Sequence, residues 1–252
     1  MATGKALDGK PYAGNPHVRF DEGEVAPAAT LRRGSLLYNG KKGFAKVKVR
    51  LAGCKVERWL VLPESMTLED FHDAIQAAFG WEHSHLWSFE SKSGDTYKIQ
   101  NEDDGLMLLR LIRNRPLPKD ASRYRLCDLL PERGAKAKYI YDFGDNWVHL
   151  ITRMAAPKET GTMCVKSVGP DCEEDFGGCW RWSAYLYLIA NGMEKTLAQD
   201  SEFPEEITAM YLDGQWTPES AEAFLKGPSA EEVTKRMREQ IGNSVDISRI
   251  RF

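Results

Sequence analysis

The chain has 252 residues, 42% of them hydrophobic and 10% aromatic, which is typical of a globular protein with a sizeable core. Its formal net charge of -3 and isoelectric point of about 6.0 exclude a uniformly basic nucleic-acid-binding protein. No run approaches the roughly 18 apolar residues of a membrane span. The five cysteines are an odd number and the N-terminus has no apolar signal segment, so we expect a reduced, cytoplasmic chain.

The chain divides by pattern into two parts. Residues 1–50 carry ten Lys and Arg against four Asp and Glu, whereas the rest of the chain is net acidic. Residues 1–43 are rich in Gly, Pro and Ala and show no sustained period, so we interpret them as a mobile basic N-terminal extension. Residues 44–252 are expected to form a single domain with an acidic helical C-terminal region.

The first regular elements are a hairpin and a helix. Phe44–Leu51 alternates apolar and basic residues, which predicts a strand with one solvated face. A second strand is expected at Val56–Leu62, and Pro63 ends it because proline cannot donate to a ladder. Thr67 has the position of a helix N-cap, and Gly80 supplies the stop. The buried stripe of this helix comprises Leu68, Phe71, Ile75, Ala78 and Phe79.

Later segments continue the alternation of hairpins and helices. We expect, in chain order, a hairpin over residues 81–99, a short helix over 125–130, a hairpin over 139–151, a loop over 155–178, and helices over 180–190, 205–212 and 230–241. Pro218 and Pro228 are interpreted as breaks between the last helices. This order predicts an α+β fold, with a mostly antiparallel sheet built from β-hairpins, packed helices and a helical C-terminal part.

The hairpin over Tyr139–Ile151 is the predicted structural centre, and it reads Y-I-Y-D-F-G-D-N-W-V-H-L-I. Its aromatic residues alternate on both sides of turn-forming residues, as in two half-buried strands. Large aromatic side chains dominate cores of this size. We therefore expect a structural core that includes Tyr141, Phe143, Trp147 and Trp81.

The register of this hairpin decides which side chains meet. If Asp145-Asn146 is a two-residue loop, Asp142 lies directly opposite His149 on one face. If Gly144-Asp145 is the loop, Asp142 instead faces Trp147. The sequence leaves both registers open.

Imidazole and carboxylate side chains supply the candidates for a hydrolytic or metal site, because mixed sets of these groups bind zinc, manganese or iron. Candidate catalytic residues are Asp142, Asp145, His149, Glu174 and Asp175; candidate metal ligands are His72, His85 and His149, with His83 close in sequence. The spacing matches no His-Glu-x-x-His motif, and the alternative is that these are hydrogen-bonded histidines of the fold. No cofactor is expected unless these residues bind a divalent metal.

Two further features are interpreted structurally. Cys164, Cys172 and Cys179 are more widely spaced than the paired cysteines of zinc sites, so we expect buried free thiols. Gly177-Gly178 precedes a predicted helix, where backbone N–H groups can bind anions. It lacks the lysine and hydroxyl of a phosphate-binding loop, so we interpret it as a tight turn.

The stretch of residues 110–138 is basic and contains an aromatic residue, a combination found at phosphate and single-strand binding surfaces. The candidate nucleic-acid contacts are Arg110, Arg113, Arg115, Arg123 and Arg125, together with the N-terminal extension. The alternative is that this stretch faces solvent or the acidic C-terminal region.

Three blocks of the sequence resemble one protein family. The first is T-L-E-D-F-H-D-A-I-Q-A-A-F-G-W followed by H-L-W-S-F-E, the second is Y-D-F-G-D-N-W-V-H, and the third is C-E-E-D-F-G-G. Their order and chemistry are similar to those of the Ri plasmid ORF-three-like family, also described as the passenger TnpR family of an insertion element. The resemblance covers residues 44–241 and implies a bacterial, plasmid-borne α+β protein whose function is uncharacterised.

The chain departs from the family pattern in the third block, which usually reads C-P-P-E-D-C-G-G. One residue is missing here, and Phe176 stands at the place of the second cysteine. The TnpR label suggests a resolvase, but a serine recombinase would end in a basic helix-turn-helix, whereas this chain ends in an acidic helical region.

These observations favour an accessory or binding module of a mobile element, without a complete catalytic constellation. Its partner would be an unknown protein or nucleic acid, with no membrane, and the oligomeric state is left open. One alternative is a metal-dependent enzyme that uses Asp142 and His149 of the central hairpin. The other is a nucleic-acid-binding protein that uses residues 110–138 and the N-terminal extension.

Overall fold

A computed structural model describes residues 43–99, 117–192, 209 and 216–244, which all fall within the compact unit Lys42–Phe252. Almost all of the predicted N-terminal extension, residues 1–43, lies outside the described residues. The same holds for the predicted helix over residues 205–212, apart from Ala209.

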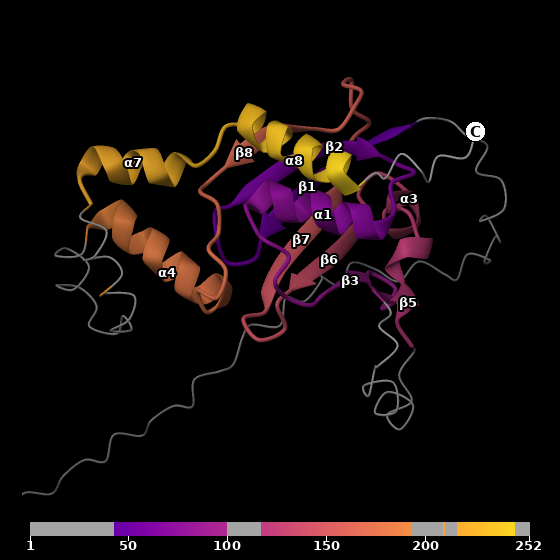
Figure 1. The fold of residues 1–252 in the computed structure, drawn as a ribbon, viewed down its shortest axis with the longest axis horizontal. Coiled ribbons are helices and arrows are strands. Elements are labelled where there is room, and N and C mark those ends of the chain that lie inside the picture. Colours follow the sequence, from indigo (N-terminus) through magenta and orange to yellow (C-terminus); the bar gives the residue numbers. More distant parts are fainter. Residues whose placement is uncertain (1–42, 100–116, 193–208, 210–215, 245–252) are drawn as a thin grey trace, which may run out of the picture. The chain divides into compact units, whose positions relative to one another are not determined.

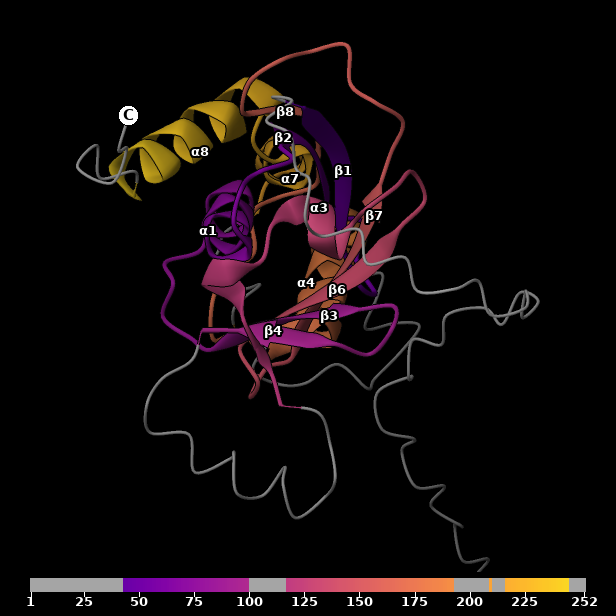
Figure 2. The same ribbon diagram turned by 90° about the vertical axis from the view of Figure 1, so that its right-hand side faces the viewer.

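One eight-stranded sheet organises the described residues (Figures 1 and 2). Its strands are β1 (Phe44–Leu51), β2 (Glu57–Pro63), β3 (Trp87–Ser91), β4 (Thr96–Lys98), β5 (Lys119–Asp120), β6 (Lys136–Tyr141), β7 (Trp147–Arg153) and β8 (Met163–Val168). Their order across the sheet is β5-β4-β3-β6-β7-β1-β2-β8. All of these neighbours pair antiparallel except β4 and β5, which confirms the predicted fold class.

Helices cover the sheet and form the C-terminal part. They are α1 (Leu68–Phe79), the one-turn α3 (Leu126–Leu129), α4 (Gly178–Asn191), α7 (Pro218–Lys226) and α8 (Ala230–Ser244), with a 3₁₀ turn at Ala121–Arg123. Helix α8 packs against α1 and β8, and both views show it beside α1 (Figures 1 and 2). Helix α4 packs against α7 and contacts β7.

The ends of α1 follow from its sequence. The Thr67 hydroxyl accepts a hydrogen bond from the Asp70 backbone N–H at 3.0 Å, and the Asp70 carboxylate accepts one from the Thr67 N–H at 3.4 Å. Gly80 ends the helix with a φ of 80°, a left-handed conformation that glycine adopts without steric cost. The predicted stripe is buried, and the same face also buries His72 and Gln76.

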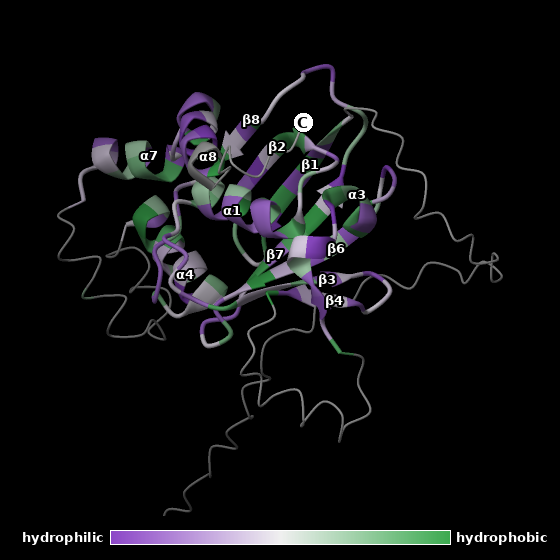
Figure 3. Ribbon diagram, turned by 45° about the vertical axis from the view of Figure 1, so that its right-hand side comes forward, coloured by the Kyte–Doolittle hydropathy of each residue, from purple (hydrophilic) through white to green (hydrophobic). Residues whose placement is uncertain are grey.

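The core is aromatic where β6 and β7 meet α1. Tyr141, Trp147 and Trp81 are buried, which confirms three of the four predicted core residues. Trp81 stacks on Tyr141 with ring centroids 4.7 Å apart and lies 5.5 Å from Trp147. Figure 3 shows the most hydrophobic residues along the central strands, whereas α8 is more hydrophilic.

The expected burial of Phe143 is wrong, and so are both expected registers of the central hairpin. Tyr141 pairs with Trp147 and Tyr139 with His149, so the connection spans residues 142–146 rather than two residues. Asp142 and Asn146 both have a positive φ within this connection, and the Asn146 N–H donates to the Asp142 carbonyl at 2.6 Å. Phe143 therefore leaves the strand and is 50% exposed.

Two other predictions need correction. The expected loop over residues 155–178 contains β8, an edge strand that pairs with β2. Pro218 does not break a helix but begins α7, because proline is favoured at the first helical position, where its missing N–H costs nothing.

Candidate functional site

Three segments meet at one end of the β3–β6 pair. Antiparallel pairing of Trp87 with Tyr141 places the segment before β3 beside the segment after β6. The stretch before α4 reaches the same place, because the Gly177 N–H donates to the Asp145 carboxylate at 2.7 Å. A Cβ on Gly178 would lie 2.2 Å from the Asp145 carbonyl oxygen, so glycine is required for this approach. The tight turn expected at Gly177-Gly178 is confirmed, with φ values of 90° and 82°.

These segments bring together His85, Asp142, Glu174 and Asp175, which we call the His85 cluster. The His85 Nε2 lies 3.0 Å from Asp175 Oδ1 and 3.9 Å from Glu174 Oε2, and its Nδ1 lies 4.0 Å from Asp142 Oδ1. Nε2 is buried and makes no aligned hydrogen bond with any described residue, although Asp175 is close. The carboxylates of Glu174 and Asp175 therefore lie close to His85 Nε2 without forming an aligned hydrogen bond with it.

Neutral donors fix two of these carboxylates. Glu174 Oε1 accepts hydrogen bonds from the Tyr141 hydroxyl and from the Glu82 backbone N–H, each at 2.7 Å. Asp142 Oδ1 accepts one from the Gly144 N–H at 2.9 Å. Burial and the neighbouring Glu174 raise the pKa of Tyr141 well above its ordinary value, so this phenol stays a hydrogen-bond donor.

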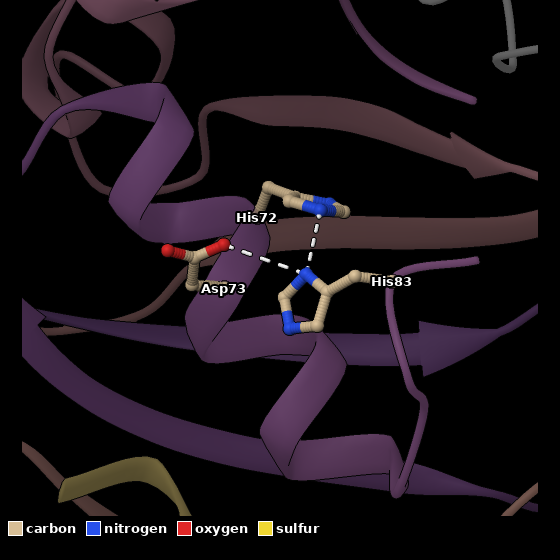
Figure 4. Close-up of side chains that lie close together, drawn as sticks. All are labelled: His72, Asp73 and His83. Atoms are coloured by element: carbon tan, nitrogen blue, oxygen red, sulfur yellow. Dashed lines mark hydrogen bonds and ion pairs between the residues drawn. The ribbon is translucent and has the colours of Figure 1, made fainter. Parts of the chain in front are cut away.

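A second group lies beside the first, and we call it the His72 cluster: His72, Asp73 and His83. His72 Nε2 is 3.1 Å from His83 Nδ1, and Asp73 Oδ1 is 3.5 Å from the same nitrogen. Figure 4 shows His72 and Asp73 on α1, both joined to one ring nitrogen of His83 from the segment that follows. His72 is almost fully buried, whereas the side chains of His83 and Asp73 are 27% and 20% exposed.

Burial shapes the protonation of the His72 cluster. It lowers the pKa of His72 to about 2, with His83 as a second cause, and it also lowers the pKa of His83. Both imidazoles are therefore neutral at pH 7 and keep a lone pair for a ligand. Burial, then the neighbouring Asp70 and Glu69, raises the pKa of Asp73 to about 6.

Left-handed backbone conformations concentrate in these two clusters. Among the described non-glycine residues, only four have a positive φ: His83, Asp142, Asn146 and Asp175, at 62°, 53°, 56° and 58°. Three of the four belong to the clusters. Such conformations cost energy and gather at functional sites, because the surrounding structure must hold them in place.

The other candidate residues have structural positions. His149 is fully buried between Phe79 and Trp81, with ring centroids at 4.7 and 5.0 Å, so the expected Asp142–His149 pair is wrong. Among the described residues, His149 also lies outside both groups of histidine and carboxylate side chains that could hold a metal ion. Asp145 binds the Gly177 backbone and anchors the start of α4.

His149 predicts a pH dependence of stability, because burial lowers its pKa to about 3. Unfolding lets it take up a proton below its ordinary pKa of about 6.5, so its contribution to stability is complete above that pH and falls between about 6.5 and 3. The slope reaches about 1.4 kcal/mol per pH unit. We expect the free energy of unfolding of His149→Phe to depend less steeply on pH than that of the wild type between about pH 6.5 and 3. Urea unfolding of both proteins at several pH values in this range measures the two slopes. Equal slopes would contradict a buried neutral His149.

The predicted nucleic-acid contacts stay a prediction. Arg110, Arg113 and Arg115 lie outside the described residues. The Arg123 side chain pairs with Asp120 at 3.2 Å, and Arg125 donates to the Ser65 carbonyl at 2.6 Å.

The cysteines agree in part with the expected buried thiols. All five are free; Cys164 and Cys172 are buried, whereas Cys179 is partly exposed. The buried Cys54 thiol donates to the Cys179 carbonyl oxygen at 3.2 Å, across a long stretch of sequence.

The sequence gives no sign that Asp73 belongs to a site. It also does not show that His72 and His85 belong to two different clusters. Asp73 follows His72 directly, and adjacent residues do not share a helix face, so no spacing rule linked them. They meet only because His83 lies beyond the end of the helix and its ring turns back between them.

Comparison with known proteins points to one family. The family model described as plasmid pRiA4b ORF-3-like protein matches residues 44–223. The uncharacterized protein y4hQ of Sinorhizobium fredii is 31% identical over 153 residues, which cover 59% of this chain and 73% of that protein. The crystal structure of MM3350 from Methanosarcina mazei Go1, titled a protein of unknown function, has a TM-score of 0.50 and 26% identity, and the match covers 69% of this chain and 92% of that one.

Among the described helices, none combines the length and apolar character that crossing a membrane requires. The family model spans the whole sheet, α1, α4 and both clusters, and its start coincides with that of β1. The chain therefore belongs to the plasmid pRiA4b ORF-3-like family.

Proposed function

We propose that this protein is a metal-dependent binding module, in which His85, Asp142 and Asp175 hold a divalent cation. One observation carries the proposal: three separate segments bring a ligand atom from each of these residues to within 4.8 Å of the others. Imidazole with carboxylates suits zinc, manganese or iron better than magnesium or calcium, which prefer oxygen ligands alone.

Electrostatics support a cation at this place. Glu174 joins Asp142 and Asp175 around the single imidazole of His85, so three carboxylates crowd one ring. The oxygen atoms that Asp142 and Asp175 offer lie within 4.8 Å of each other, so their negative charges repel. The repulsion is stronger where the site is partly withdrawn from water. A divalent ion offsets that repulsion and gives the buried Nε2 of His85 a partner.

The exposed side of the cluster suggests what the ion would bind. Asp175 has a side chain that is 77% exposed, and the residues next to His85 and Asp142 are Leu86 and Phe143, at 62% and 50% exposed. An ion with open coordination positions binds carboxylate or phosphate oxygens. We infer a partner that presents an acidic group to the ion and apolar groups to Leu86 and Phe143, as an accessory module of a mobile element would need.

An enzymatic role is the second candidate, and it uses His85 where the sequence suggested His149. It is favoured by Glu174, whose Oε2 lies 3.9 Å from His85 and which is positioned by Tyr141. A carboxylate next to an open metal position can accept a proton from bound water. Steady metal-dependent hydrolysis of a phosphodiester that Glu174→Gln abolishes would favour this role over simple binding.

The metal site is tested by titrating chelator-treated full-length protein with zinc or manganese in a calorimeter. We expect Asp142→Asn and His85→Gln to weaken binding at this site by at least about 10- to 100-fold, the loss seen when even an outer-shell partner is removed. Asp120→Asn is the matched control, because Asp120 caps the turn at Ala121–Arg123 away from the cluster. Unchanged binding in both cluster variants, with thermal melting showing that they are folded, would refute the proposal.

A further inference from the structure

The His72 cluster has the dimensions of a metal site. Ligands that surround zinc tetrahedrally at about 2.0–2.1 Å lie about 3.3–3.4 Å from one another. The His83 Nδ1 lies 3.1 Å from His72 Nε2 and 3.5 Å from Asp73 Oδ1, and all three atoms lie within 4.8 Å of one another. Two imidazoles and one carboxylate are also the set that binds zinc or non-haem iron with open positions.

A hydrogen-bond chain fixes how His72 is oriented. The His83 backbone N–H donates to Gln76 Oε1 at 3.0 Å, so the amide of Gln76 must present its NH₂ group to the Tyr139 oxygen, at 2.8 Å. The Tyr139 hydroxyl then donates its own proton to His72 Nδ1 at 2.7 Å. An imidazole whose Nδ1 accepts a hydrogen bond carries its proton on Nε2, so the proton of His72 points at His83 Nδ1.

This series of hydrogen bonds leaves the Asp73 carboxylate without a donor at His83. If His83 Nδ1 accepts the proton of His72, it has none to give to Asp73, and two lone pairs face each other at 3.5 Å. If Nδ1 instead carries a proton for Asp73, that proton faces the one on His72 Nε2. With Tyr139 as the donor to His72, neither tautomer of His83 satisfies all three side chains, whereas a cation at their common point would be bound by all three ligand atoms.

We propose that His72, Asp73 and His83 form a second metal site, independent of the His85 cluster, for a divalent transition-metal ion such as zinc, cobalt or iron. The ion takes the lone pair of His72 Nε2, and the proton of that nitrogen moves to Nδ1. The Tyr139 oxygen would then face the Nδ1 proton of His72 and remain the outer partner that orients the ligand.

The surroundings allow an ion to enter and a further ligand to follow. His83 and Asp73 are partly exposed, whereas His72 is held from behind by buried groups. The side chain of Gln240 on α8 contacts His83 Nε2. Gln240 also lines a cleft of about 440 Å³ with Ala77, Gly80, Trp81, Arg236 and Glu239. Water that reaches the partly exposed His83 and Asp73 can supply the remaining coordination position.

Cobalt(II) added to chelator-treated full-length protein tests the site, because four-coordinate cobalt absorbs visible light far more strongly than six-coordinate cobalt. We expect the wild type to develop the intense band with one equivalent bound at this site. His83→Gln and Asp73→Asn should each remove the band and one equivalent in calorimetry. His72 is not replaced, because its burial makes loss of folding a competing explanation.

The matched variants His85→Gln and Asp142→Asn separate this site from the first. Both variants should keep the intense cobalt band of the His72 cluster and lose the equivalent of metal bound at the His85 cluster. Each of the two proposed sites can therefore be refuted while the other is still measured. The proposal is overturned if the folded wild type shows no intense band, or if the band persists in both His83→Gln and Asp73→Asn. Thermal melting of each variant establishes that it is folded.

Discussion

Replacing Trp147 by alanine is expected to lower the free energy of unfolding by about 3–5 kcal/mol, the range for a large aromatic side chain removed from a core. Trp147 is fully buried and packs against Trp81 beside the paired Tyr141. Its indole nitrogen has no hydrogen-bond partner within the part of the chain that the structure describes, so the loss comes from packing and from the cavity that remains. Urea unfolding followed by far-UV circular dichroism gives the value.

Trp180→Ala is the control for this measurement, because it removes the same side chain from a position that is 56% exposed. Surface substitutions usually change stability by less than about 0.5 kcal/mol. A loss below about 1 kcal/mol at Trp147 would mean that the hairpin does not anchor the core and that its surface serves a partner instead.

The local signals of the sequence were sufficient for the elements that depend on near neighbours. Thr67, Asp70 and Gly80 determine where α1 begins and ends through contacts within a few residues. Alternation located β1, β2, β6 and β7 for the same reason, because the side-chain period of a strand is local. The antiparallel α+β class followed from the order of these elements.

The hairpin register depended on something the local pattern did not contain. Gly144 to Asn146 resembled a two-residue turn, but Asp142 also adopts a left-handed conformation and lengthens the connection. Contacts with residues distant in the sequence stabilise the longer connection. The Asp142 backbone N–H donates to the Leu86 carbonyl, and the Asp145 carboxylate accepts a hydrogen bond from the Gly177 N–H. The turn is therefore shaped by the segments that build the site.

The candidate site was anticipated residue by residue but not in its grouping. The sequence points to His85, Asp142 and Asp175 individually, whereas in one of its two registers it places Asp142 opposite His149, which lies in the core. The grouping follows from the pairing of β3 with β6 and from the packing of Gly178 on the β6–β7 connection. Both are long-range contacts, and a single sequence does not reveal them.

Arg58 is the second residue whose loss should be severe, and no sequence pattern marked it. It lies on β2 and is fully buried, although arginine is rarely buried without partners. Its Nε donates to the Ala78 carbonyl at 2.8 Å, at the end of α1, and its Nη1 donates to the Val168 carbonyl at 2.8 Å. Nη2 reaches the Pro170 carbonyl and Asp171, each at 3.2 Å.

We expect Arg58→Met to lower the free energy of unfolding by about 3–5 kcal/mol, because three backbone carbonyl groups lose a donor at roughly 1–3 kcal/mol each. Asp171 keeps a partner, because Arg236 binds it at 2.7 and 3.0 Å, so the loss arises mainly from carbonyl groups left without donors. Arg123→Ala is the control, since that side chain is 82% exposed and should contribute less than about 0.5 kcal/mol.

Arg58→Lys distinguishes charge from geometry. Lysine keeps the positive charge but cannot donate in the three directions that the guanidinium fork supplies, so we expect it to recover only a minor part of the loss. Arg58 joins the end of α1, which carries His72 and Asp73, to the stretch that leads from β8 to Glu174 and Asp175. A folded Arg58→Lys protein should therefore also bind metal more weakly at both clusters. Full recovery of stability and metal binding would show that charge alone holds these segments together.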